Sequence, residues 1–268
     1  MKYIHHYTTI DNLALILESK KIRFTRLDLL DDIKEVAGLD NPIEKIDKSI
    51  FISSWTEDNE ENIPLWKMYA SITNGIRITM PQDMFQKNLF KAFAQQNHGM
   101  TVDMYSPFTK EEIFYNGKYQ IINIFDSNRE DFYKKVKYRD DFMDVYQSLI
   151  KRSENGIEIA CLWDLGKFKS KKWKFQKEVR FTIYTKVLNP AYSEKTMQQY
   201  GADNIRQWYE NPDKYIDVSL SDEAFKNMTI TLAPCATDAQ RVIVKSLIHT
   251  YGLHNEFKES DLRDTIRK

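Results

Sequence analysis

The clearest alternation of apolar and polar positions runs from Lys172 to Lys186, where most odd positions are apolar and most even positions are polar. This period of two predicts a β-strand. Successive strand side chains point to opposite faces, so Gln176, Glu178 and Arg180 should stand in a row on one side. Taken alone, the stretch favours a half-buried strand whose polar row faces water, and only the rest of the chain can favour a cleft instead.

The N-terminal pattern predicts a strand, a helix and a second strand. Residues Tyr3 to Tyr7 are aromatic-rich and are followed by two threonines, either of which can cap a helix over Ile10 to Ser19. The helix has apolar residues at core-facing spacing, and alternation returns over Ile22 to Thr25. The acidic stretch Leu30 to Glu35 then predicts a turn.

A second strand, helix and strand are predicted over Ser49 to Thr56, Pro64 to Ala70 and Gly75 to Met80. A helix is expected over Met84 to Ala94. The pattern across about residues 82–135 is otherwise mixed, and an insertion would sit there.

The C-terminal third is predicted to contain two strands, Tyr215 to Leu220 and Met228 to Leu232, on either side of a short helix that begins at Ser221, and two longer helices. One is a polar stretch over Tyr192 to Tyr209. The other spans Thr237 to Tyr251, where Thr237 and Gln240 form a capping box and Gly252 ends the helix. Its predicted apolar stripe consists of Val242, Ile243, Leu247 and Tyr251. Short strands with unevenly placed helices favour one α+β domain over residues 1–268, with no dinucleotide-binding glycine motif or P-loop.

The composition excludes several classes of protein. The 268 residues carry 39 Lys plus Arg and 39 Asp plus Glu, so no net field attracts nucleic acid or anionic membrane, although a local basic cleft stays open. No stretch resembles a signal peptide or a membrane span, so a soluble, cytoplasmic protein without a membrane partner is expected. The two cysteines and five histidines show no metal-ligand spacing, so no metal site is expected.

Four residues are candidates for chemistry: His6 at the end of the first strand, Trp66 and Tyr69 on the short helix, and Glu178 on the alternating strand. Each also has a structural interpretation. The histidine and aromatic residues could belong to the core, and Glu178 could pair with Arg180. Individually these structural interpretations are favoured.

The order and settings of these residues resemble a known group of proteins. The stretch YIHHYTTIDNLALILESKKIRF is similar to the opening of ADP-ribosyltransferase-like domains, in which a strand ending in H-x-T precedes a helix and a second strand. IHHYTT, the Leu30 to Glu35 turn, FISSWTE, PLWKMYA, KKWKFQKEVRF and the ITLAP region are similar to a bacterial and phage family known only as a domain of unknown function. The first resemblance implies an ADP-ribosyltransferase-like split β-sheet core with surrounding helices.

The resemblance also implies roles for individual residues. His6 would bind a ribose of NAD, Tyr69 would stack on nicotinamide, and Glu178 would hold the nicotinamide ribose and stabilise its developing positive charge. Together these three would be the catalytic set. Thr8 and Trp66 would complete the NAD-binding set together with Arg23, which is chosen over Arg26 and Arg77 to contact the diphosphate. Gln176, in a Q-x-E arrangement with Glu178, would orient the acceptor together with Arg180.

The implied function is cleavage of the nicotinamide–ribose bond of NAD and modification of a macromolecular acceptor, protein or nucleic acid, in toxin or phage-defence biology. The unknown-function family usually has glutamate at the position of Gln176, and an asparagine-aspartate-proline turn where this chain has Asp31, Asp32 and Ile33. Adjacent strand residues point to opposite faces, so His5 and His6 are alternatives for the cleft histidine, and the H-x-T match favours His6. Two other functions stay open: a non-catalytic nucleotide or nucleic-acid sensor, and an interaction protein whose aromatic residues are all core.

Overall fold

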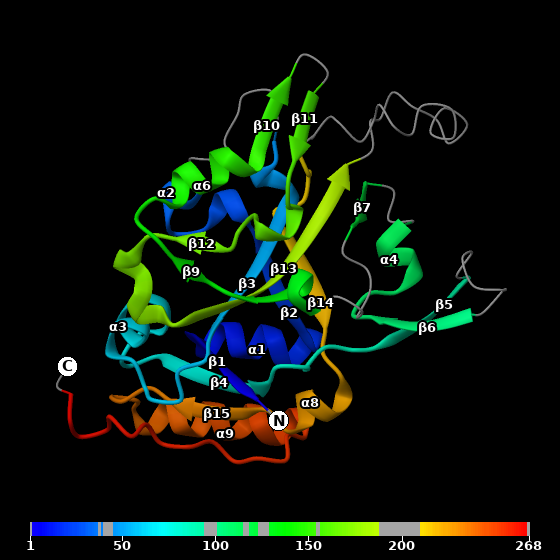
Figure 1. The fold of residues 1–268 in the computed structure, drawn as a ribbon. Helices are drawn as coiled ribbons and strands as arrows, with labels where there is room; N and C mark the ends of the chain where they lie inside the picture. Colours follow the sequence, from blue (N-terminus) through cyan, green and yellow to red (C-terminus); the bar gives the residue numbers. More distant parts are fainter. Residues whose placement is uncertain are drawn as a thin grey trace.

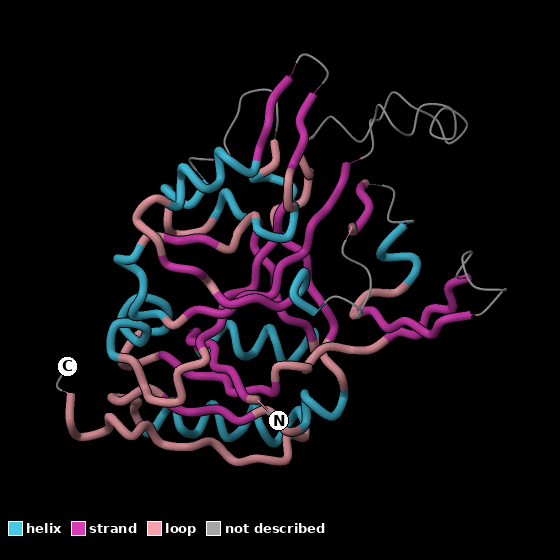
Figure 2. The backbone as a smooth tube through the Cα atoms, in the orientation of Figure 1, coloured by secondary structure: helices cyan, strands magenta, loops and turns pink. Residues whose placement is uncertain are grey.

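An antiparallel β-sheet runs through the centre of the computed structural model, with helices and short strands on both of its faces (Figure 1). The structure describes residues 2–36, 39, 45–93, 101–114, 118–122, 129–153, 156–187 and 210–266. Helix and strand are mixed along the described chain, as Figure 2 shows, and the main sheet is antiparallel, so the expected α+β class is confirmed.

The strands of the described chain have the following bounds: β1 (Tyr3–Thr9), β2 (Lys21–Arg26), β3 (Ile50–Thr56), β4 (Gly75–Pro81), β5 (Asn88–Phe93), β6 (Thr101–Ser106), β7 (Tyr119–Ile121), β8 (Tyr133–Lys135), β9 (Lys137–Tyr138), β10 (Ile150–Ser153), β11 (Gly156–Ile159), β12 (Phe168–Lys169), β13 (Glu178–Val187), β14 (Tyr215–Ser219) and β15 (Thr229–Leu232).

The helices of the described chain are α1 (Ile10–Ser19), α2 (Ile33–Val36), α3 (Ile63–Leu65), α4 (Lys110–Phe114), α5 (Arg129–Phe132), α6 (Phe142–Leu149), α8 (Asp222–Lys226) and α9 (Asp238–Tyr251). A π-helical turn, Trp66–Ala70, directly follows α3. Short 3₁₀ turns cover Leu27–Leu29, Asp47–Ser49, Leu162–Asp164 and Lys171–Gln176.

Strand β3 organises the sheet. Its β-branched and aromatic sequence, IFISSWT, suits a strand that is buried on both faces. One edge of β3 pairs with β13 from Glu178↔Thr56 to Tyr184↔Ile50. The other edge is shared, because β2 pairs with its beginning and β1 with its end. The order across the described sheet is β14-β2-β3-β1-β4-β15, with β13 beside β3 and β7 and β8 beside β13.

Apolar clusters cover both faces of β13 and β3. Val179, Phe181 and Ile183 belong to the larger cluster, which includes residues of α1 and α9. Tyr184 belongs to a second cluster formed with α6 and the segments around β12. Every residue from Glu178 to Thr185 is therefore buried, so the polar row does not face water, although the alternation of this strand taken alone would suggest that it does.

The alternating stretch also begins differently from its prediction. Residues Lys171–Gln176 form a 3₁₀ turn capped by Ser170, whose hydroxyl accepts the backbone N–H of Lys172. Lys177 then adopts a left-handed conformation (φ 43°), which reorients the chain before β13 starts at Glu178. The strand predicted from Lys172 is therefore six residues too long at its N-terminal end.

The start of α1 and both ends of α9 lie where the sequence signals predict them. The hydroxyl of Thr9 accepts the backbone N–H of Asn12 at the start of α1. Thr237 and Gln240 form the predicted capping box of α9, and Gly252 (φ 65°) ends that helix with a conformation that glycine adopts without strain.

Of the four residues predicted to form the apolar stripe of α9, Leu247 and Tyr251 pack against the larger apolar cluster, and the other two do not. Val244 and Ile248 are the buried residues, while the side chains of Val242 and Ile243 are 65% and 49% exposed.

The region from 82 to 135 contributes both to the main sheet and to a separate hairpin. β5 and β6 pair only with one another among the described strands, whereas β7 and β8 pair with β13. The helix predicted over Met84 to Ala94 is wrong, because Asn88–Phe93 form β5.

The helix predicted over Tyr192 to Tyr209 lies outside the described residues. In the described part of the chain, no helix combines the length and apolar character required to cross a membrane.

Candidate functional site

A cleft lies where β1 and β2 diverge along one edge of β3. β2 pairs with Phe51 and Ile52, and β1 pairs with Thr56. Neither of these strands has a register partner for the intervening residues Ser53, Ser54 and Trp55. The backbone carbonyl of Ser54 instead accepts a hydrogen bond from the side chain of His6 (Nδ1 to O, 2.9 Å).

The cleft has a volume of about 320 Å³. It is lined by six of the eight residues predicted to form the site: His6, Arg23, Tyr69, Gln176, Glu178 and Arg180. They come from β1, β2, the π-helical turn and the segment that enters β13, so residues far apart in sequence meet at one place.

Glu178 and Arg180 form a buried ion pair on β13. The Arg180 guanidinium donates to the two Glu178 carboxylate oxygens at 2.6 and 3.2 Å. It also donates to both carboxylate oxygens of Glu35 on α2, and to the carbonyl of Gly166 at 2.9 Å. Burial opposes ionisation of Glu178, but the positive charges of Arg180 and Lys169 outweigh it and lower the pKa of Glu178 to about 2. The carboxylate is therefore ionised at neutral pH.

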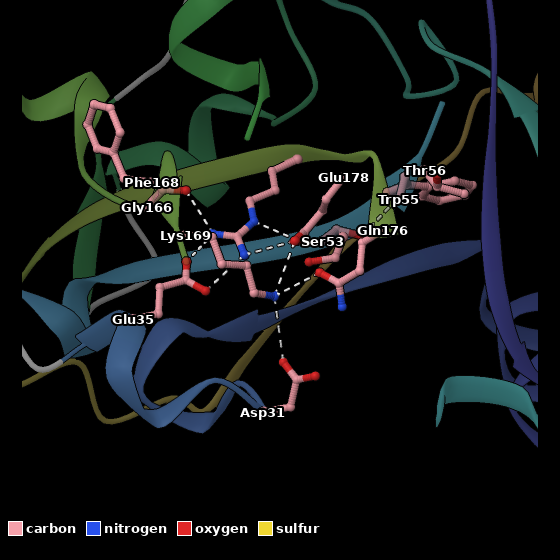
Figure 3. A network of polar contacts seen from close by, with 12 residues as sticks. Asp31, Glu35, Ser53, Trp55, Thr56, Gly166, Phe168, Lys169, Gln176 and Glu178 are labelled. Carbon is pink, nitrogen blue, oxygen red and sulfur yellow. Dashed lines mark hydrogen bonds and ion pairs between the residues drawn. The ribbon is translucent and has the colours of Figure 1, made fainter. Parts of the chain in front are cut away.

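Lys169 on β12 supplies the second cation of this cluster. Its ammonium lies 3.3 Å from a Glu178 oxygen and 3.1 Å from the side-chain oxygen of Gln176 (Figure 3). It also lies 4.6 Å from the centre of the Trp173 ring and 3.9 Å from a carboxylate oxygen of Asp31. Its side chain is only 3% exposed, so it is a fixed charge in the wall of the cleft.

Tyr69 is held in place by two hydrogen bonds from its hydroxyl group. The hydroxyl donates to the carboxylate of Asp31 and accepts from the side-chain nitrogen of Gln176 at 2.6 Å. Burial and the Asp31 carboxylate raise the pKa of Tyr69 well above its usual value. The side chain remains 37% exposed, so part of the ring is accessible.

Both histidines of β1 line the cleft, and they differ in their contacts. His5 shares a strand register with Thr56, which is itself opposite Glu178, so these three residues lie on one face of the sheet. The His5 ring contacts the Thr79 hydroxyl at 2.8 Å and the Asn59 side-chain oxygen at 3.3 Å.

The His6 ring instead packs against Trp55, with ring centres 5.1 Å apart. Burial lowers the pKa of His6, and its Nδ1 proton is donated to Ser54, so the neutral ring keeps Nε2 as an acceptor. His6 follows His5 on β1, so it points to the face opposite Glu178, although both histidines line the cleft. The choice between His5 and His6 as the ligand-binding histidine stays a prediction.

Arg23 lines the cleft but is already paired. Its guanidinium donates two hydrogen bonds to Asp217 on the neighbouring strand β14, at 2.9 and 3.0 Å, and lies 4.8 Å from the Tyr215 ring. A diphosphate would have to share this arginine with Asp217.

Two predicted residues are not in the cleft. Trp66 is fully buried in a small cluster with Tyr7, and its indole N–H donates to Glu61 at 2.8 Å. Thr8 is buried, and its hydroxyl accepts from the side chain of Asn12 at 2.9 Å. Neither side chain lines the cleft, so the structure does not bring Trp66 and Thr8 together with the other predicted residues.

Asp31, Glu35 and Lys169 belong to the same polar cluster, although no sequence pattern assigned them a role in the site. Asp31 and Glu35 were visible only as an acidic turn, and Lys169 only as one of several lysines before the alternating stretch. Lys169 is buried among partners from other segments of the chain, so no local sequence pattern could identify it. Among the described residues, no group of three or more histidine, cysteine, aspartate or glutamate side chains is arranged to hold a metal ion.

The comparison with protein families gives one match. Residues 65–181 match the model of a family described as "Protein of unknown function (DUF2971)". The match covers less than half of the chain and includes Tyr69, Lys169, Gln176, Glu178 and Arg180, but not the histidines of β1 or Asp31. No curated protein and no solved structure matches the chain. Over these residues the chain is therefore similar to an uncharacterised family.

Proposed function

We propose that the cleft binds NAD and that the protein cleaves the nicotinamide–ribose bond, transferring ADP-ribose to a macromolecular acceptor. The observation that carries the proposal is that His6, Tyr69 and Glu178 line one cleft although they come from three separate elements. The divergence of β1 and β2 is compatible with the split sheet of ADP-ribosyltransferase-like domains. The setting in toxin or phage-defence biology rests on the sequence resemblance alone.

Glu178 has the properties that the bond cleavage requires. When the bond between ribose C1′ and the nicotinamide nitrogen breaks, its electron pair leaves with nicotinamide and the ribose becomes positively charged. A carboxylate held ionised beside that ring stabilises the charge as it develops. With a pKa of about 2, Glu178 acts in this account as a fixed negative charge and takes no proton at neutral pH.

Tyr69 and His6 are suited to bind nicotinamide and ribose, the two groups that the scissile bond joins. The Tyr69 hydroxyl is held by Asp31 and Gln176, which fixes the ring in place, and its exposed part can stack on nicotinamide. The Nε2 atom of His6 can accept a ribose hydroxyl, because Nδ1 carries the proton given to Ser54.

A second candidate is a nucleotide sensor without catalysis on the same fold. It is favoured by the pairing of Glu178, since Arg180, Lys169 and the hydroxyl of Ser54 all donate to that carboxylate. A ribose hydroxyl would have to displace one of these donors, and the 3.3 Å contact with Lys169 is longer than either contact with Arg180. A nucleic-acid ligand is disfavoured, because Arg23, Lys169 and Arg180 are all paired with carboxylates.

Two measurements separate the candidates. Calorimetric titration with NAD tests binding, and incubation with NAD labelled in its adenylate phosphate, together with a cell lysate, tests transfer to a macromolecule. The transferase proposal predicts both binding and label transfer. Binding without label transfer or nicotinamide release would support the sensor. Absence of NAD binding would contradict both the transferase and the sensor.

A further inference from the structure

The side chain of Gln176 is unsuited to activating an acceptor. Its oxygen accepts from Lys169 at 3.1 Å and its nitrogen donates to Tyr69 at 2.6 Å, so both ends of the amide are engaged and the residue is buried. An amide also cannot take up a proton near neutral pH. A hydroxyl group that attacks ribose C1′ must lose its proton, so another residue of the cleft has to receive it.

Asp31 is placed for that task. It lines the cleft, and its side chain is 40% exposed, so an acceptor can approach it from solvent. The Tyr69 hydroxyl donates to one carboxylate oxygen of Asp31. The other oxygen lies 3.9 Å from the Lys169 ammonium (Figure 3). These contacts fix the direction of the carboxylate without burying it.

Lys169 lies close to both Asp31 and Glu178. The same ammonium lies 3.3 Å from Glu178 and 3.9 Å from Asp31, so two carboxylates flank one nitrogen at different depths of the cleft. The buried Glu178 is enclosed by donors, whereas Asp31 keeps an accessible edge. Glycoside-cleaving sites use such a pair, in which one carboxylate supports the cationic sugar and the other activates the incoming nucleophile.

We infer that Asp31 is the general base of the reaction and that the acceptor attacks through a neutral hydroxyl group, of which water is the smallest. This inference rests on the proposed NAD cleavage. The C1′–nitrogen bond breaks and nicotinamide leaves with the electron pair. The acceptor oxygen forms a bond to C1′, and its proton passes to a carboxylate oxygen of Asp31. With water the products are nicotinamide, ADP-ribose and one proton.

The test uses a nucleophile that has no proton to lose. Nicotinamide release and ADP-ribose products are measured for the wild type and Asp31→Asn, in buffer alone and with added sodium azide. General-base catalysis typically contributes about 10²–10⁴-fold, so Asp31→Asn should lose at least about 10²-fold in buffer. Azide should restore most of the lost rate and yield the azido adduct of ADP-ribose, while the calorimetric affinity for NAD stays close to wild type. Adding methanol to the wild type should give methyl ADP-riboside beside ADP-ribose.

The controls separate this inference from the proposed function. Asp11→Asn makes the same change on an exposed residue of α1 and should match the wild type. Asp31→Glu retains a carboxylate and should be more active than Asp31→Asn, and circular dichroism checks that both variants fold. A wild type that releases nicotinamide, with Asp31→Asn equally active or not restored by azide, overturns the role of Asp31 and leaves NAD cleavage standing. A wild type that releases none overturns both.

Discussion

Arg180 neutralises two buried carboxylates. Its guanidinium is fully buried and pairs with the carboxylates of Glu35 and Glu178. Removing one partner from a buried ion pair leaves uncompensated charge, which typically costs about 3–5 kcal/mol. We therefore expect Arg180→Gln to lower the free energy of unfolding in urea by about that amount.

Arg23→Gln is the matched control for this change. Arg23 makes a similar two-bond pair with Asp217, but its side chain is 57% exposed, so its loss should cost less than about 1 kcal/mol. Equal losses for the two variants would show that the Arg180 network is no more important to stability than a surface pair.

Lys134 makes stability depend on pH. Its side-chain nitrogen donates to the carbonyl of Trp163 at 2.9 Å and to the hydroxyl of Tyr184 at 2.7 Å, and burial lowers its pKa from 10.5 to about 7. Between these values the unfolded chain holds a proton that the folded chain has released, so this residue makes stability rise with pH.

The corresponding variant is Lys134→Met. One proton corresponds to about 1.4 kcal/mol per pH unit, so between pH 7.5 and 9.5 the free energy of unfolding should rise more steeply in the wild type by up to that amount. Urea unfolding at several pH values provides the comparison. Parallel pH dependences in the two proteins would contradict the buried, deprotonated state of Lys134.

The sequence predicted some residues of the cleft and missed others for physical reasons. Glu178 and Tyr69 were found because a family resemblance gave them roles, and both line the cleft. Trp66 was assigned to the cofactor, but a helix has an inner and an outer side, and its indole faces the core. Asp31 and Lys169 were missed because their meeting depends on tertiary structure.

At the scale of the element, the buried face of helix α9 can be tested by substitution. Val244 is fully buried, whereas Val242, two positions earlier, is 65% exposed. Val244→Ala should therefore destabilise the protein by about 1–3 kcal/mol, and Val242→Ala by less than about 0.5 kcal/mol. Thermal unfolding of the two variants checks this, and a greater loss for Val242→Ala would restore the stripe predicted from the sequence.

Element types were predicted better than their bounds and faces. The capping box and Gly252 marked the ends of α9 because those signals are local. The start of β13 was misplaced because a 3₁₀ turn and a left-handed Lys177 continue the same alternation of residue types. Its polar row is buried because a second layer, containing Glu35, covers the face that alternation alone assigned to water.

At the scale of the whole molecule, the cleft depends on the divergence of β1 and β2 along β3. That divergence leaves Ser53 to Trp55 beside a cleft instead of beside a strand. Strand order and the meeting of β1 with β13 across β3 are not encoded in any single segment. The sequence could therefore predict the α+β class and, through the resemblance, most of the residues that line the cleft, whereas the strand order that forms the cleft is seen only in the assembled sheet.

The central claim is that Glu178 supports cleavage of the nicotinamide–ribose bond in this cleft. The most direct measurement is the rate of nicotinamide release from NAD by the wild type and by Glu178→Gln, which keeps the shape of the side chain and removes its charge. Loss of one group that stabilises developing charge typically costs about 10²–10³-fold in rate, and we predict a decrease of that size with a folded variant. Wild-type protein that releases no nicotinamide, or a Glu178→Gln variant that releases it at the wild-type rate, would contradict the account.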